Sequence, residues 1–95
     1  MRVFVGVVGF EWDDGNRDKN LIKHSVTSGE CEEVFQDANR QFYPDVRHSG
    51  AEERYVVVGA TKDGRILRIA FTTRRDHIRI ISARPINKKE RKLYA

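Results

Sequence analysis

The sequence predicts an α+β fold in which two helices pack on one face of an antiparallel sheet, in the order β-α-α-β-β-β-β-α. Two local signals carry this prediction. Asp63-Gly64 lies between two β-branched runs, which is a strong hairpin signal. Thr27 and Glu30 have the spacing of a helix capping box. With 95 residues, we expect a single domain over residues 1–95, with one modest core.

The first half of the chain predicts two strands and two helices. Residues 2–9 are rich in valine and predict a strand, and residues 13–24 predict a helix exposed on most sides. A second helix begins after Thr27, ends near Asp37 and shows one apolar face. Residues 40–46 predict a short strand that Pro44 confines to a sheet edge or a strand end.

The second half predicts three consecutive antiparallel strands and a final helical turn. Asp63-Gly64 and Arg75-Asp76 mark the two hairpin turns. Asn87 and Glu90 suit the start of a short helix over residues 87–94, which depends on tertiary contacts. The three strands are expected at residues 54–61, 65–73 and 77–84.

Alternation along these strands predicts which side chains face the helices. On the strand 65–73, Leu67, Ile69 and Phe71 share the face that we expect to be covered, whereas Arg68 and Thr72 share a face that we expect to be largely open. On the strand 77–84, the Ile80-Ile81 pair breaks simple alternation, so either a bulge lies there or both faces are partly covered. We assign Arg79 and Arg84 to the open face.

Charge is distributed unevenly along the chain. Residues 1–53 carry six Lys/Arg and eleven Asp/Glu, a net charge of −5, whereas residues 54–95 carry twelve and three, a net charge of +9. Guanidinium groups on one face of a sheet bind phosphates, so RNA is the first candidate partner. Seven arginines interleave with the strand-like runs: Arg54, Arg65, Arg68, Arg74, Arg75, Arg79 and Arg84.

Metal, disulfide and membrane chemistry are not indicated. The three histidines lack metal-ligand spacing, and Cys31 is the only cysteine, so we expect neither a metal site nor a cofactor. The apolar opening run is too short to span a bilayer, so we expect a cytoplasmic protein without a membrane partner. Cys31 is interpreted as a small core residue, and Trp12 as a structural residue that anchors the join between the first strand and the first helix.

Several blocks resemble the BrnT toxins: FEWD at residues 10–13, Lys23-His24, RIISAR at residues 79–84, and Glu90, Arg91 and Tyr94 near the end. The resemblance implies a RelE-like fold and a ribonuclease toxin of a bacterial type II toxin–antitoxin pair, which inhibits translation. It also implies a BrnA-like antitoxin, with operator DNA bound only through the complex. Asn16, Ser25 and Ser28 depart from the family pattern. Ser25 replaces a glycine that would end a helix in a left-handed conformation more easily.

RNA can be cut without a metal when its 2′-hydroxyl attacks the adjacent phosphorus, provided that the protein stabilises charge and moves protons. We expect several arginines to converge in one shallow cleft for this purpose. The candidate catalytic residues are Arg65, Arg79 and Arg84 for charge, His24 for proton transfer and, by resemblance to RelE-like enzymes, Tyr94. The candidates for holding the flanking RNA backbone are Arg54, Arg74 and Lys23.

Two other function classes use the same residues. The basic sheet could bind nucleic acid without cutting it, or it could dock an acidic protein partner. His24 is also explained as a histidine capping carbonyls at a helix end.

Overall fold

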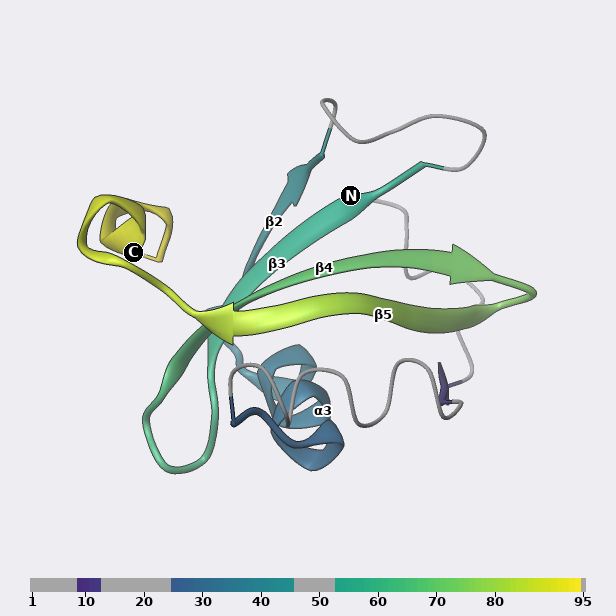
Figure 1. Ribbon diagram of the computed structural model, residues 1–95, viewed down its shortest axis with the longest axis horizontal. Helices are drawn as coiled ribbons and strands as arrows, with labels where there is room; N and C mark the ends of the chain where they lie inside the picture. Colours follow the sequence, from purple (N-terminus) through teal and green to yellow (C-terminus); the bar gives the residue numbers. More distant parts are fainter. Residues whose placement is uncertain (1–8, 13–24, 46–52, 95) are drawn as a thin grey trace.

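The computed structural model of the protein describes residues 9–12, 25–45 and 53–94. Five strands form one sheet in the order β1-β5-β4-β3-β2. Figure 1 shows α3 under one face of this sheet and the yellow C-terminal helix η2 beyond the end of β5. The elements are β1 (Gly9–Glu11), α3 (Ser28–Gln36), β2 (Gln41–Pro44), β3 (Tyr55–Ala60), β4 (Ile66–Arg74), β5 (His77–Pro85) and the 3₁₀ helix η2 (Lys88–Leu93).

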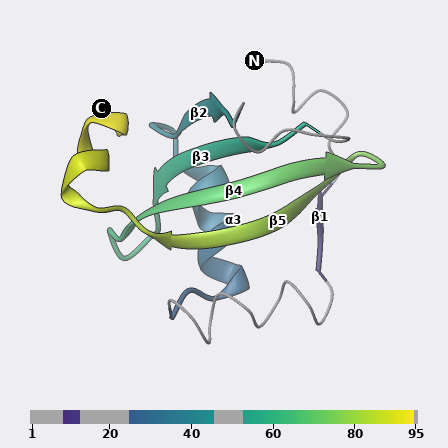
Figure 2. The same cartoon turned by 45° about the horizontal axis from the view of Figure 1, so that its top comes forward.

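The sheet is mixed, so the prediction of a purely antiparallel sheet is wrong. Strands β2 to β5 pair antiparallel, but β1 runs parallel to β5, with Phe10 opposite Ile78. Figure 2 shows β1 beside the start of β5. Hairpin turns fix the direction of the consecutive strands, whereas β1 joins its partner through a long crossover that permits parallel pairing. The predicted strand 2–9, apart from Gly9, and the predicted helix 13–24 lie outside the described residues.

Helix α3 begins where the sequence predicts. The Thr27 hydroxyl accepts a hydrogen bond from the Glu30 amide at 3.1 Å, and the Glu30 carboxylate accepts one from the Thr27 amide at 3.1 Å. This reciprocal pair satisfies two amides that a helix leaves free at its start. The predicted capping box is therefore confirmed, and the helix ends at Asp37 as expected.

The core lies between α3 and one face of the sheet. The predicted inward set of β4 is confirmed, because Leu67, Ile69 and Phe71 are fully buried and pack with Val34 of α3. Gly59 on β3 permits the close approach of the helix, since a Cβ there would lie 2.9 Å from Val34 Cγ1. Burial of this apolar face is the main contribution to stability.

Both predicted hairpin turns are confirmed. Gly64 has a φ of +87°, which suits glycine. Arg75 and Asp76 have φ values of 50° and 65°, the left-handed pair that a two-residue hairpin turn requires. None of the described helices is long and apolar enough to cross a bilayer.

A bulge on β5 decides which arginines share a face. Ala70 lies opposite Ser82, but its neighbour Phe71 lies opposite Ile80, so Ile81 is the extra residue. The extra residue resets the alternation, and Arg79 and Arg84 therefore lie on the same face, opposite α3. Strict alternation would have separated them.

Candidate functional site

The face of the sheet opposite α3 carries the cationic side chains of β4 and β5. Arg68 lies opposite Arg84, and Thr72 lies opposite Arg79. The face is less open than expected, because Thr72 is only 2% exposed and its hydroxyl donates to the Glu53 carbonyl at 2.7 Å. We call it the polar face.

Arg84 and Arg68 share one carboxylate on the polar face. Both Glu90 oxygens accept hydrogen bonds from the Arg84 guanidinium at 2.7 Å, and Arg68 Nε lies 3.5 Å from Glu90 Oε2. The hydrogen bonds from Arg84 come first among the causes that lower the pKa of Glu90 from 4.5 to about 2. The same hydrogen bonds raise the pKa of Arg84. Glu90 is therefore ionised at neutral pH.

Arg79 lies towards the other end of β5. Its Nη1 donates to Glu11 Oε1 at 2.6 Å, and β1 places Glu11 directly beside it. Arg79 and Arg84 are five residues apart on a strand, roughly 15 Å including the bulge. Each belongs to a separate ion pair at its own end of the strand.

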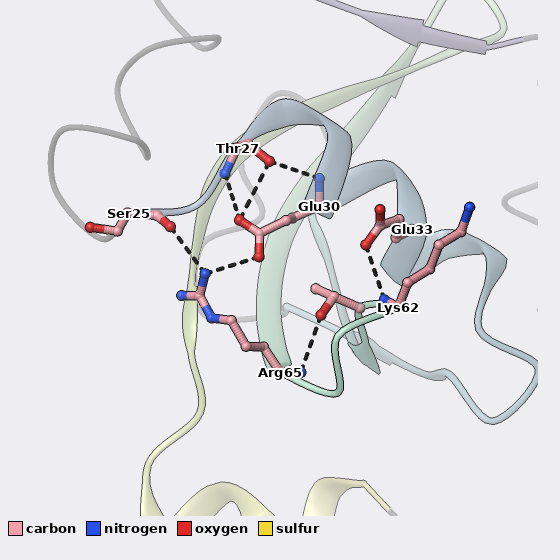
Figure 3. Close-up of polar contacts among 7 residues, drawn as sticks. Ser25, Thr27, Glu30, Glu33, Lys62 and Arg65 are labelled. Atoms are coloured by element: carbon pink, nitrogen blue, oxygen red, sulfur yellow. Dashed lines mark hydrogen bonds and ion pairs between the residues drawn. The ribbon is translucent and has the colours of Figure 1, made fainter.

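Arg65 lies at a third place, on the side of the sheet that faces α3. Its Nη1 donates to the Ser25 carbonyl at 3.1 Å and to Glu30 Oε2 at 2.9 Å (Figure 3). Both contacts use the same nitrogen, so the guanidinium is held at one edge. Ser25 adopts a φ of 55°, the left-handed conformation expected at that position.

The expectation that these arginines converge in one cleft is wrong. The structure pairs Arg65 with Glu30, Arg79 with Glu11 and Arg84 with Glu90, at three places on the sheet. The acidic residues come mostly from other elements, and each neutralises the nearest cation. Strand alternation alone could not predict partners so distant in the chain.

A pocket of about 470 Å³ lies at the end of the sheet near η2, and it brings two predicted site residues together. Arg65 and Tyr94 line it, together with Arg91 and the apolar side chains of Ile66 and Ile86. Among the described residues, no carboxylate pairs with the exposed Arg91 side chain. The pocket is thus lined by two arginines, a tyrosine and apolar residues.

Tyr94 is held in place by Asp37. Its hydroxyl donates to Asp37 Oδ2 at 2.6 Å, and the Ala60 amide donates to the same oxygen at 2.8 Å. Burial tends to raise the pKa of Asp37, but the hydrogen bonds from Tyr94, Ala60 and Asn39 outweigh it and lower that pKa. The hydrogen bond to Asp37 raises the pKa of Tyr94, so its phenol stays protonated.

The other predicted site residues are placed as follows. The carbonyl of Arg54 accepts from the Asp45 amide at 2.9 Å, just before β3 begins. Arg74 is exposed at the end of β4, on the polar face. Lys23 and His24 lie outside the described residues.

Sequence reasoning did not single out Arg91 or Glu90 as phosphate-site residues. Arg91 was visible only in the block shared with the BrnT toxins. Glu90 is recognisable locally as a capping residue, and the structure confirms that capping box with Asn87. Its second role, as partner of Arg84, depends on where η2 packs.

Trp12 and Cys31 both lie among core and packing contacts, as expected for residues with a structural role. Trp12 Nε1 donates to Glu32 at 2.8 Å, and its ring stacks near Phe10 with centroids 6.2 Å apart. Burial raises the pKa of the Cys31 thiol to about 12, so it is an unreactive core group. In the parts of the chain that the structure describes, no three His, Cys, Asp or Glu side chains gather as metal ligands.

Comparison with known families adds independent information. The family model described as the ribonuclease toxin BrnT of type II toxin–antitoxin systems matches residues 12–90, most of the chain. No curated protein matches the sequence. The matched range includes α3, β2 to β5 and the first turn of η2.

Proposed function

Because the chain belongs to the BrnT family of ribonuclease toxins, we propose that it is an endoribonuclease that cuts RNA without a metal ion and inhibits translation. The family match over residues 12–90 is the observation that carries this proposal. We also propose a RelE-like fold, which the packing of α3 on one face of the sheet supports.

The pocket at the end of the sheet is the proposed place of cleavage. Arg65 and Arg91 line it, and the planar guanidinium fork of an arginine matches the oxygens of a phosphate in the transition state. The 2′-hydroxyl of the bound nucleotide attacks the phosphorus attached to the 3′-oxygen of the same ribose, and the 5′-oxygen of the next nucleotide leaves. The products are a cyclic phosphate and a free 5′-hydroxyl.

Proton transfer is assigned to His24, because histidine is the side chain that ordinarily changes charge near neutral pH. Tyr94 is assigned a positioning role, because its hydroxyl is engaged by Asp37 while its ring lines the pocket. An aromatic ring suits stacking with a base. Tyr94 then orients the substrate rather than moving a proton.

The remaining cations are assigned to the RNA backbone on either side of the cut. Arg79 and Arg84 lie on the polar face with Arg74, and we assign these three, with Arg54 and Lys23, to flanking phosphates. Arg79 is roughly 20 Å along β5 from the pocket end of the strand. Loss of Arg79 should therefore weaken binding more than it slows the chemical step.

A BrnA-like antitoxin is the proposed partner. An acidic antitoxin segment lying over the cationic residues would occupy the phosphate positions, and operator DNA would be bound only through the complex. Charge complementarity of this kind accelerates encounter, so salt should slow association more than it weakens the final complex.

The decisive test compares Arg65→Ala with Lys62→Ala, which removes the same charge from the adjacent turn. In purified form, the unaltered protein should cut RNA in EDTA, giving a cyclic phosphate end. Arg65→Ala should lower the rate about 10²- to 10³-fold, whereas Lys62→Ala should not. In cells, induction should arrest growth. Equal activity of two folded variants, or cleavage that needs a divalent ion, would refute the proposed site or chemistry.

One observation favours a second function, RNA binding without cleavage. Arg65, Arg79 and Arg84 are each engaged by a carboxylate, and the pocket contains no His, Asp or Glu among its described lining residues. Salt-dependent RNA binding without any cleavage product would favour this alternative. Affinity for an acidic protein alone, with no RNA binding at low salt, would contradict both.

A further inference from the structure

The contact between Glu90 and the two arginines of the polar face has the form of an occupied anion site. Arg84 donates both terminal nitrogens to the two carboxylate oxygens at 2.7 Å, and Arg68 approaches one of them at 3.5 Å. A guanidinium fork binds a phosphate group with the same paired geometry.

The two cations need an anion between them. Arg68 and Arg84 lie directly opposite each other on neighbouring antiparallel strands, where like charges repel. Both side chains come from the two central strands of a rigid sheet, and both are about one third exposed or less, at 27% and 34%. The pair is therefore fixed in position, whether or not Glu90 occupies it.

The element that supplies Glu90 is held weakly in comparison. η2 has six residues and none of them is buried. Besides the Glu90 pairs, the Tyr43 hydroxyl of β2 donates to the Leu93 carbonyl at 2.5 Å, and Tyr94, just after η2, donates to Asp37 at the end of α3. The side chains of a short 3₁₀ helix with little apolar burial rearrange at low free-energy cost.

We propose that Arg68 and Arg84 form a binding site for a phosphate of the RNA backbone, and that Glu90 occupies it as an internal anion until RNA displaces it. This inference rests on the proposed RNA substrate, and it adds a subsite and an autoinhibitory contact to it. Displacement turns the Glu90 side chain away from Arg68 and Arg84, while η2 keeps Arg91 and Tyr94 at the pocket and the strands are unchanged. Free protein thus binds RNA less tightly than the cations alone would allow.

The exchange predicts a gain in affinity when the carboxylate is neutralised. Glu90→Gln keeps the shape of the side chain and removes the charge that competes with phosphate. We expect binding to tighten on the order of tenfold, about 1.4 kcal/mol, because the charged carboxylate holds the two arginines more strongly than a neutral amide does. The salt dependence should also become steeper by roughly one unit of log–log slope, since freed cations release counterions.

The test uses a fluorescent single-stranded RNA with 2′-O-methyl groups, which binds but cannot be cut. Affinity is measured by anisotropy over a series of salt concentrations for the unaltered protein, Glu90→Gln and Glu33→Gln. Glu33 lies on α3, so the control makes the same charge change on the opposite side of the sheet. Tightening by Glu90→Gln alone supports the inference. Equal effects of both variants, or weaker binding by Glu90→Gln, overturn it.

Two further experiments keep the inference testable if Glu90→Gln fails to fold. One uses a double variant, and the other uses the unaltered protein. Adding Arg68→Ala to Glu90→Gln should remove most of the gain, and a gain that survives overturns the inference. In the unaltered protein, the uncut RNA should shift the NMR signals of the Asn87 and Glu90 amides, because the Asn87 amide donates to Glu90 Oε1 at 3.0 Å. If RNA binds and these signals do not move, Glu90 is not displaced.

The same protein, tested on unmodified RNA, separates this inference from the proposed function. Cleavage by the unaltered protein, with no gain from Glu90→Gln, refutes only the internal-anion site. Absence of both binding and cleavage refutes the RNA substrate, and the inference with it.

Discussion

The two faces of β4 and β5 differ in what they contribute, although the same strands build both. The helix-covered face buries Leu67, Ile69 and Phe71 completely. The polar face carries Arg68 and its neighbours, which are paired with partly exposed carboxylates that each contribute about 0–1 kcal/mol. Stability therefore resides on one face, while charge on the other can change at little cost to the fold.

The largest effect should come from Phe71→Ala. Phe71 is fully buried, and its ring packs against Phe35 and Tyr55, with centroids 5.1 and 5.7 Å away. Removing the ring should lower the free energy of unfolding by about 3–5 kcal/mol, measured by urea denaturation. Arg68→Ala, on the other face of the same strand, should cost about 1 kcal/mol or less. Similar losses from both changes would break the distinction between the faces.

The next largest effect tests how tightly the helix packs on its face. In Gly59→Ala, the added Cβ would lie 3.1 Å from the Val34 carbonyl oxygen, which is backbone and cannot easily move. We expect a loss of about 2 kcal/mol from overpacking. Gly29→Ala adds the same methyl group with nothing closer than 3.9 Å, and should stabilise by about 0.5–1 kcal/mol. Thermal unfolding of both variants checks the opposite signs.

The sequence predicted features that depend on neighbours in the chain. The capping box at Thr27, the turn at Asp63-Gly64 and the inward set of β4 require only local spacing, and all are confirmed. Hydrophobic periodicity predicts a face well because a whole strand contributes to the pattern.

Features set by distant residues were missed. The parallel pairing of β1 with β5 joins Glu11 to Arg79 across 68 positions, and Arg65 meets Glu30 across 35. A run of cations predicts a phosphate-binding surface, but not which carboxylates fold back onto it. The face of Arg84 was predicted correctly, because the Ile80-Ile81 pair marked the position of the bulge, although the sequence left open whether both faces were partly covered instead.

Acid should expose the role of the Glu90 pair on the polar face. Because the folded pKa of Glu90 is about 2, below its ordinary 4.5, its contribution is full above pH 4.5 and is lost as the pH falls towards 2. At neutral pH, Glu90→Gln should lower the free energy of unfolding by about 1 kcal/mol. The difference in the free energy of unfolding between this variant and the unaltered protein should shrink towards zero near pH 2. Urea denaturation at a series of pH values measures it. If the difference stays constant over this pH range, Glu90 does not form a stabilising ion pair with Arg84.

The smallest effect should come from Ser25→Gly, which changes stability on the helix side of the sheet and leaves the polar face unaltered. Ser25 has a φ of 55°, a conformation that costs a residue with a Cβ about 1 kcal/mol relative to glycine. Ser25→Gly should therefore raise the midpoint of thermal unfolding by about 4 °C. Ser25→Ala keeps the strained Cβ and should show no such gain.

The same substitution should leave RNA affinity unchanged. Arg65 binds the main-chain carbonyl of Ser25, which every substitution retains, and the polar face lies on the other side of the sheet. A Ser25→Gly variant that is more stable but binds RNA differently would mean that the backbone change at Ser25 reaches the guanidinium of Arg65. Stability and RNA binding would then be coupled on the helix side, and the separation of stability from charge would fail.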